Sequence, residues 1–600
     1  MTDAAAVGAL LGLTDPAAAG AVAARLDVLL AAMPVAVRAG VRAGLGAVAV
    51  AARTGTGRPL SELDVAGRDA LLTRITAHPA LAAALDLVKM PALLAAGAVA
   101  APSPAPGGRP DAELDCTPSF GWPGSTRADA VVIGSGAGGA MAARTLARAG
   151  LAVIVLEEGR RHPVAEFRTA SPLDRFRTLY RDGGATVALG NPPVVLPIGR
   201  GVGGTTLVNS GTCYRTPDHV LARWSREHGL AVDRFPALLD EVEATLQVAP
   251  QPLDVLGANG EIALRGARAL GWAAAPLRRN APGCGGCCQC AIGCPRNAKN
   301  GVHLNALPQA CAAGARIVTD ARVERVLSER GRAAGVLARR PDGTAFAIRA
   351  PLVVVAAGAT ETPPLLRRSG LGRHPGLGRG MAVHPAVSVA GRFAEPVRAW
   401  QGVMQSVGVE ELHRRGILIE ATAAPPGMST FVLPGLGSRL AAERAGADRL
   451  AFLGAMIADR PSGRVHGSRR PLLTYRLHPD DAATLRDAIV AMGRILFAAG
   501  AQEVLTGLTA NPVATTVNGL RDIVAGTPTA ALHVAAFHPT GSARMGADAQ
   551  RAPVDATGAL RGISGVVVAD ASVLPSCPEV NPQLSIMAAA LAVAHHAAGT

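Results

Sequence analysis

The chain has 600 residues, of which 49% are hydrophobic, 17% charged and 3% aromatic. This composition is typical of a large, folded protein with two or three domains and excludes a disordered one. The net charge is +14, but the arginines that cause it are scattered and no basic run carries interleaved aromatics, so we predict no nucleic-acid partner.

The start of the chain carries neither a basic segment nor a cleavage site, and no apolar run reaches about 18 residues without a charge or a break. We therefore expect no secretory signal, no membrane-spanning helix and a cytoplasmic protein. Residues 15–100 are predicted to be helical, with Asp15 capping a helix that begins at Pro16. They indicate either a helical domain packed on the rest of the protein or an interfacial membrane or substrate-entry surface. A membrane surface would place the protein at the inner face of the membrane.

A Pro- and Gly-rich stretch separates these helices from a segment of different character. Residues 131–133 (VVI) form a predicted strand, and Gly134, Gly136 and Gly139 follow it in the pattern G-x-G-x-x-G. These glycines permit a tight turn, a close approach of backbone amides to a pyrophosphate, and close packing of helix on strand. Glu157 ends the next predicted strand, where an acid can bind ribose hydroxyls. The pattern predicts a dinucleotide site but does not separate FAD from NAD.

Four later sequence blocks favour FAD over NAD as the bound dinucleotide. They are GRGVGGTTLVNSGTCYR (199–215), VVVAAGATETPPLLRRSGLG (353–372), HPTGSARMG (538–546) and the C-terminal stretch 566–598 that begins VVVADASVLPSCPEVNPQ. With the first glycine loop, they resemble in their order the glucose–methanol–choline (GMC) family of flavin oxidoreductases, from about Ala128 to the C-terminus. Cys213 departs from the family pattern, which has an aromatic residue or alanine there.

The resemblance implies an α/β fold, with a Rossmann-like FAD-binding domain, an interleaved α+β substrate domain and the N-terminal helical domain. The expected divisions are an N-terminal helical domain (1–105), a linker (106–127), FAD-binding parts (128–215, 301–385 and 531–600) and substrate-domain parts (216–300, with a cysteine-rich loop, and 386–530).

The resemblance also implies FAD as the cofactor, held noncovalently or through a histidine. The residues that it assigns to FAD are Gly134, Gly136, Gly139 and Glu157 for the ADP half, Gly203, Gly204 and Asn209 for the pyrophosphate and ring, Val323 for the adenine, Asp570 and Ala571 for the diphosphate, and Pro582 for the isoalloxazine edge.

Oxidising an alcohol requires a base for the hydroxyl proton and an acceptor for the α-carbon hydride, and histidine suits the first task. The family pattern puts this base at His538. Its partner precedes a proline and is Asn581 here, which would hydrogen-bond the alcohol oxygen. His384, in GRGMAVHP, is expected to support the flavin region rather than to react.

Five of the nine cysteines lie between Gly283 and Asn300. Cys284, Cys287, Cys290 and Cys294 have the spacing C-x2-C-x2-C-x3-C of a bacterial ferredoxin run. In the sugar dehydrogenases of the GMC family, which this chain resembles, cysteines matching Cys284, Cys290 and Cys294 bind a three-iron cluster. The long-chain alcohol oxidases of that family carry similar cysteines without an established redox role. Three interpretations stay open: a [3Fe–4S] or [4Fe–4S] cluster, a structural thiol or disulfide knot, and a zinc site.

The N-terminal helices and the apolar segment 416–437 resemble the long-chain alcohol oxidase branch most. We therefore expect FAD-dependent oxidation of a lipophilic primary or secondary alcohol, with O2 or a quinone or cytochrome carrier as electron acceptor. Two alternatives are a flavin and iron–sulfur dehydrogenase of a polyol or sugar, and a flavin-binding electron-transfer protein or lyase that oxidises no alcohol.

Overall fold

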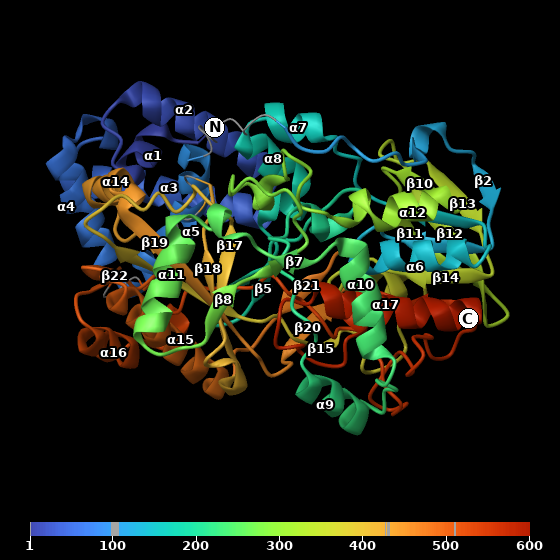
Figure 1. Cartoon of the computed structure of the whole chain (residues 1–600). Coiled ribbons are helices and arrows are strands. Elements are labelled where there is room, and N and C mark those ends of the chain that lie inside the picture. The colour runs from blue at the N-terminus through green and yellow to red at the C-terminus, as the bar shows by residue number, and fades with distance from the viewer. Residues whose placement is uncertain (1, 98–106, 426–427, 429–431, 509–511) are drawn as a thin grey trace.

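The protein is represented by a computed structural model that describes residues 2–97, 107–425, 428, 432–508 and 512–600. The remaining residues, which include parts of the predicted linker region and of the apolar segment 416–437, lie outside the described residues. Figure 1 shows two lobes side by side, one with the N-terminal helices and a large antiparallel sheet, the other with a parallel sheet and the C-terminal helix.

The parallel sheet is built from stretches that are far apart in the sequence. Its order is β1-β10-β4-β3-β14-β25, and every neighbouring pair is parallel. The strands are β1 (Cys116–Pro118), β10 (Arg316–Thr319), β4 (Val153–Leu156), β3 (Ala130–Ile133), β14 (Leu352–Val355) and β25 (Val566–Val568). Helices α6 (Ala137–Arg148), α12 (Ala306–Ala312), α17 (Gln583–Ala598) and α10 (Phe235–Leu246) pack on one another beside it. Strands β3 and β4 are wholly buried, as apolar runs in a covered parallel sheet should be.

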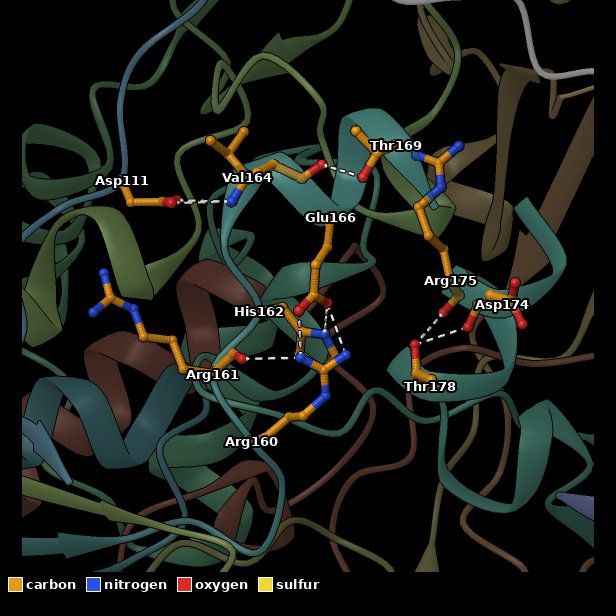
Figure 2. Close-up of polar contacts among 11 residues, drawn as sticks. Asp111, Arg160, Arg161, His162, Val164, Glu166, Thr169, Asp174, Arg175 and Thr178 are labelled. Atoms are coloured by element: carbon orange, nitrogen blue, oxygen red, sulfur yellow. Dashed lines mark hydrogen bonds and ion pairs between the residues drawn. The ribbon is translucent and has the colours of Figure 1, made fainter. Parts of the chain in front are cut away.

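The segment 106–127, predicted to be a linker, contributes two strands instead. β1 forms an edge of the parallel sheet, and β2 (Ser125–Arg127) is the last strand of a second sheet, β11-β12-β13-β2. The other strands of that sheet are β11 (Arg322–Glu329), β12 (Arg332–Arg339) and β13 (Ala345–Arg349). Asp111 also accepts a hydrogen bond from the Val164 amide at the start of α7 (Val164–Thr169), at 3.0 Å (Figure 2). Three-residue strands at a sheet edge carry no detectable periodicity, which is why this stretch was predicted to be a connection.

The second lobe contains a large, mostly antiparallel sheet. Its centre is β16 (Ala386–Arg392), β19 (Leu450–Ile457), β18 (Ile417–Thr422) and β17 (Gln405–Val409), in that order, and α11 (Gly257–Ala269) and α15 (Pro479–Ala498) pack against these strands. Shorter strands complete it: β5 (Val187–Leu189), β6 (Val194–Val195), β8 (Ala274–Pro276), β15 (Arg379–Met381), β20 (Gly463–His466), β21 (Leu472–Thr474), β22 (Glu503–Leu505), β23 (Val513–Ala514) and β24 (Val534–Ala535).

The N-terminal region forms five helices. They are α1 (Ala4–Leu11), α2 (Pro16–Ala31), α3 (Val35–Thr56), α4 (Val65–Thr76) and α5 (Pro79–Gly97). The predicted cap is confirmed, because the Asp15 carboxylate accepts from the Ala17 amide at 2.9 Å. The helices share one continuous hydrophobic core with the large sheet. The buried Lys89 ammonium donates to the Leu433 carbonyl, 344 residues later, at 2.6 Å, so these helices are integrated into the second lobe.

By length and composition, α3 could cross a membrane, as could α1 and α2 if the bent pair counted as one span. The prediction of no membrane-spanning helix rested on the charges that interrupt the apolar runs, and α3 does carry Arg38, Arg42 and Arg53; the helix passes a test of length and composition alone. Helix α3 nevertheless buries Val41, Leu45 and Val48 along one face, and it packs on α1, α4 and α5. Mostly buried core helices and signal sequences near an N-terminus pass the same test, and 22% of the α3 window is buried.

Candidate functional site

The first glycine loop joins β3 to α6, and its three predicted glycines differ in the space around them. A Cβ on Gly134, where φ is +100°, would lie 2.3 Å from the Ala356 carbonyl oxygen, and a Cβ on Gly139 would lie 2.0 Å from the Gly134 carbonyl oxygen. A Cβ on Gly136 would meet only the Cα of Gly204, at 3.9 Å. The loop is therefore tight where strand and helix pack and open at the helix N-terminus, which fits a pyrophosphate at Gly136.

Glu157 follows β4 and lies buried beside this loop. Its carboxylate accepts from the Ser135 hydroxyl at 2.6 Å, from the Ser135 amide at 3.1 Å and from the Gly159 amide at 2.9 Å. Burial raises the pKa of Glu157, and these hydrogen bonds oppose that rise. The protein thus holds the carboxylate in a fixed orientation beside the first glycine loop, which suits the predicted ribose contact. Nearby, Arg160 pairs with Glu166 at 2.6 Å, as Figure 2 shows.

The second glycine-rich segment packs directly on the first. Gly203 and Gly204 both have positive φ, and a Cβ on Gly204 would lie 2.8 Å from the Gly136 Cα. The Gly203 amide donates to the Ser135 hydroxyl at 3.1 Å. Farther along, the Asn209 side chain donates to Gln583 at the start of α17 and accepts from the Lys299 ammonium at 3.3 Å. The predicted residues of these two segments therefore converge.

The remaining residues predicted to bind FAD have varied surroundings. The Asp570 carboxylate is fully engaged by the protein, accepting from Gly358, Thr362 and Ser572 at 2.6 to 2.8 Å. Its side chain therefore fixes the turn after β14. Ala571 accepts from the Gly541 amide at 3.1 Å, the Val323 carbonyl accepts from Arg368 at 2.9 Å, and Pro582 precedes the first residue of α17.

His538 lies in a segment that runs along residues 571–573. Backbone hydrogen bonds join Gly541 to Ala571 and Ala543 to Ser572. The Nδ1 atom of His538 lies 3.0 Å from the Nδ1 atom of His384. Burial lowers the pKa of His538 to about 4, so its imidazole is neutral at physiological pH and free to accept a proton.

Asn581 is buried, and its Oδ1 atom has no hydrogen-bond partner among the described residues. Its neighbour Val580 packs with Leu418 and Met456 of the large sheet, in an apolar cluster that Ala386 contacts. Ala386 is two residues from His384, so the large sheet brings Asn581 and the histidine pair to the same region.

Glu420 lies on the same face of β18 as Leu418 and contacts Asn581. It is buried, it accepts from the Gln405 amide at 3.0 Å, and its Oε1 atom lacks a partner among the described residues. Burial raises the pKa of Glu420 to about 7, although a hydrogen bond with the Asn581 side chain opposes this. The sequence reasoning missed this residue, although a lone acid inside the apolar run ILIEAT signals a buried polar contact.

The cysteine-rich loop packs beside the second glycine-rich segment. All nine cysteines belong to the described part of the chain, and none forms a disulfide. The buried Arg279 guanidinium lies 3.8 Å from the Cys284 Sγ and 3.4 Å from the Cys290 Sγ, and it also donates to the Ser210 carbonyl. Within the described residues, no group of three or more Cys, His, Asp or Glu is arranged to hold a metal ion.

Comparison with known proteins identifies the whole arrangement. The "GMC oxidoreductase" family models match residues 176–386 and 459–590, and an "FAD binding domain" model matches 129–166. An uncharacterized GMC-type oxidoreductase of Mycobacterium tuberculosis is 58% identical over 550 residues, which cover 90% of this chain and 87% of that protein. The chain belongs to the GMC oxidoreductase family. The resemblance stated from the sequence is thereby confirmed.

More distant relatives of this GMC oxidoreductase carry functional names. A long-chain-alcohol oxidase of Arabidopsis thaliana is 32% identical over 511 residues, which cover 78% of this chain and 67% of that protein. Among solved structures, pyridoxine 4-oxidase from "Mesorbium loti" is similar with a TM-score of 0.62 and 18% identity, covering 78% of this chain and 98% of that one. Formate oxidase of Aspergillus oryzae is similar with a TM-score of 0.60 and 15% identity, covering 79% and 98%. These structures confirm the predicted fold class.

FAD fits the residues present. The open helix N-terminus at Gly136 and the oriented Glu157 carboxylate suit the pyrophosphate and ribose of a dinucleotide. Among the described residues, the buried Asn581 Oδ1 and Gln583 Nε2 atoms lack partners and are available to a bound group. The protein is therefore an FAD-dependent oxidoreductase. The structure adds two contacts that motif matching did not predict, those of His384 with His538 and of Glu420 with Asn581.

Proposed function

We propose that this GMC oxidoreductase oxidises a lipophilic, long-chain primary or secondary alcohol to the aldehyde or ketone. The observation that carries the proposal is the position of the buried His538 imidazole, which lies 3.0 Å from His384 in a segment that runs along residues 571–573; burial lowers its pKa, so it is neutral. When bound, FAD supplies an acceptor for the α-carbon hydride. His538 accepts the hydroxyl proton at Nε2, and Asn581 hydrogen-bonds the alcohol oxygen and orients it.

The substrate class is supported by two observations. The relatives at about 30% identity include proteins named long-chain-alcohol oxidases. The strand β18, which faces Asn581, carries apolar side chains apart from Glu420 and Thr422. A sugar would require several convergent polar side chains. The chain is expected to act in the cytoplasm, at the inner face of the membrane if its substrate is dissolved there.

The test is the absorption spectrum of the purified protein, mixed without oxygen with a long-chain primary alcohol and, separately, with a polyol of equal concentration. We expect the alcohol to bleach the flavin bands and the polyol to leave them unchanged. Bleaching by the polyol alone would refute a lipophilic substrate and indicate a polyol or sugar instead. Turnover without bleaching would indicate a lyase, and no reaction with any alcohol an electron-transfer protein.

A dehydrogenase with an iron–sulfur cluster is the second candidate, and it rests on the ferredoxin-like spacing of the cysteines. Arg279 contacts both Cys284 and Cys290 and reaches the segment that carries Asn209. A cluster on Cys284, Cys290 and Cys294, with Cys287 as a fourth ligand, would lie close to the flavin and pass electrons to a quinone or cytochrome. Oxygen consumption with iron-free protein would favour the oxidase.

A further inference from the structure

Two histidines from distant parts of the chain meet at the candidate site. The Nδ1 atoms of His384 and His538 lie 3.0 Å apart, and their rings are nearly perpendicular, at 89°. A hydrogen bond between two Nδ1 atoms requires a proton on one of them and a lone pair on the other. The contact therefore couples the tautomers of the two rings.

The position of His384 is fixed by its backbone. The residue has a φ of +54°, in the left-handed region that side-chain-bearing residues seldom adopt. The buried Asp459 carboxylate accepts from the His384 amide at 3.1 Å and from the Val383 amide at 3.0 Å, and it also accepts from the Tyr475 hydroxyl at 2.9 Å. Such a conformation costs about 1 to 3 kcal/mol and persists only where the surroundings enforce it. Here Asp459 enforces it.

Both imidazoles are neutral, because burial lowers the pKa of His538 to about 4 and that of His384 well below its ordinary value. Each ring thus carries one N–H. If His384 donated at Nδ1, then His538 would carry its proton on Nε2 and could not take another there. If His538 donates, its Nε2 lone pair is free for the alcohol proton. The buried Nε2 of His384 lacks a partner among the described residues in either arrangement, so it does not decide between them.

We propose that His384 is a positioning residue that accepts a hydrogen bond from Nδ1–H of His538 and so holds the catalytic base in the tautomer with a free Nε2. The inference rests on the proposed role of His538 as the base. It assigns to Asp459 the task of presenting the His384 ring at the required angle. Tautomer control of a catalytic histidine by its Nδ1 partner is a strong effect in other enzymes.

A matched pair of variants tests the assignment. Asparagine carries an amide oxygen near the Nδ1 position of histidine and tolerates positive φ, whereas glutamine carries its oxygen near the Nε2 position. We expect His384→Asn to keep the rate of anaerobic flavin reduction by the alcohol within about 5-fold of the parent, and His384→Gln to lower it by about 10². Both should bind FAD stoichiometrically. His374→Leu, at another His–Pro pair that lies outside the site, should leave the rate unchanged.

A double-mutant cycle with His538→Ala separates the outcomes. If His384 acts through His538, His384→Gln costs nothing further once His538 is alanine. Multiplied losses in the double variant, or equal rates for the asparagine and glutamine variants, would overturn the inference. If His538→Ala itself reduces its flavin at the parent rate, the proposed base is wrong and the proposed function must be revised. If His384→Gln loses FAD, the test rests on His384→Asn alone. A flavin-reduction rate close to that of the parent then supports the assignment, and a rate far below it overturns the assignment.

Discussion

Replacing Glu420 by glutamine should change the pH dependence of stability. Burial raises the pKa of this carboxyl from 4.5 to about 7 in the folded chain. Below pH 4.5 both the folded and unfolded states hold the proton. As the pH rises toward 7 the unfolded state loses it first, so folding stability falls, and above 7 the loss is complete. At about 1.4 kcal/mol per pH unit, the interval amounts to about 3 kcal/mol.

Glutamine carries no charge, so Glu420→Gln removes this loss. Its amide oxygen can still accept from the Gln405 side chain, and its N–H groups can donate to Asn581 Oδ1, which has no partner in the described part of the chain. We expect the variant to be more stable than the parent by about 1 kcal/mol at pH 5 and about 3 kcal/mol at pH 8.

The assay is thermal unfolding of both proteins with saturating FAD at the two pH values. Because the unfolding entropy is about 2.1 cal/mol/K per residue, these energies correspond to gains in Tm of about 1 °C at pH 5 and 2–3 °C at pH 8. Glu395→Gln, at an exposed position, serves as the control and should show no such trend. Equal Tm gains for Glu420→Gln at both pH values would refute the reasoning.

Three further outcomes are expected. His538→Ala should keep FAD but reduce it ~10²-fold more slowly, and an unchanged rate in this variant would exclude His538 as the base. Gly136→Val should lose FAD on desalting, since its side chain would fill the open helix N-terminus, whereas Gly20→Val, with similar room on α2, should keep the yellow cofactor. Cys290→Ser should lower iron content from ~3–4 atoms per chain in anaerobically purified parent while flavin reduction persists; iron-free parent protein with full activity toward O2 would reject the cluster.

The fold was predictable where one local signal sufficed. The apolar strand and glycine turn before α6 marked the nucleotide-binding unit, and Asp15 with Pro16 marked the start of α2. The strands β1 and β2 were not predictable, since they have three residues each and form only because an edge of another sheet is available. Their partners lie about 200 residues away in the sequence.

The candidate site was predictable residue by residue but not in its contacts. Family motifs gave His538 and Asn581, yet nothing local indicates that His384 meets His538 across 154 residues. That meeting depends on a left-handed backbone imposed by Asp459, which belongs to another segment. The sequence could have indicated Glu420 as a buried polar residue, because it is a single acid in an apolar strand. Its contact with Asn581 could not be predicted, because it depends on the packing of the large sheet.

The joint core of the N-terminal helices and the large sheet has a consequence for biosynthesis. Lys89 reaches the ribosome exit 344 residues before the carbonyl of Leu433 that binds its ammonium. At about 5–20 residues per second, translation separates the two by roughly 17 to 70 seconds. Throughout that interval α1 lacks the later helix α14 (Gly437–Ala445), on which it packs, and the N-terminal helices lack the rest of their shared core. The nascent chain therefore exposes apolar helix surface during this interval. We expect the yield of folded protein to rise at lower temperature or with abundant chaperones, because both slow aggregation of the incomplete chain.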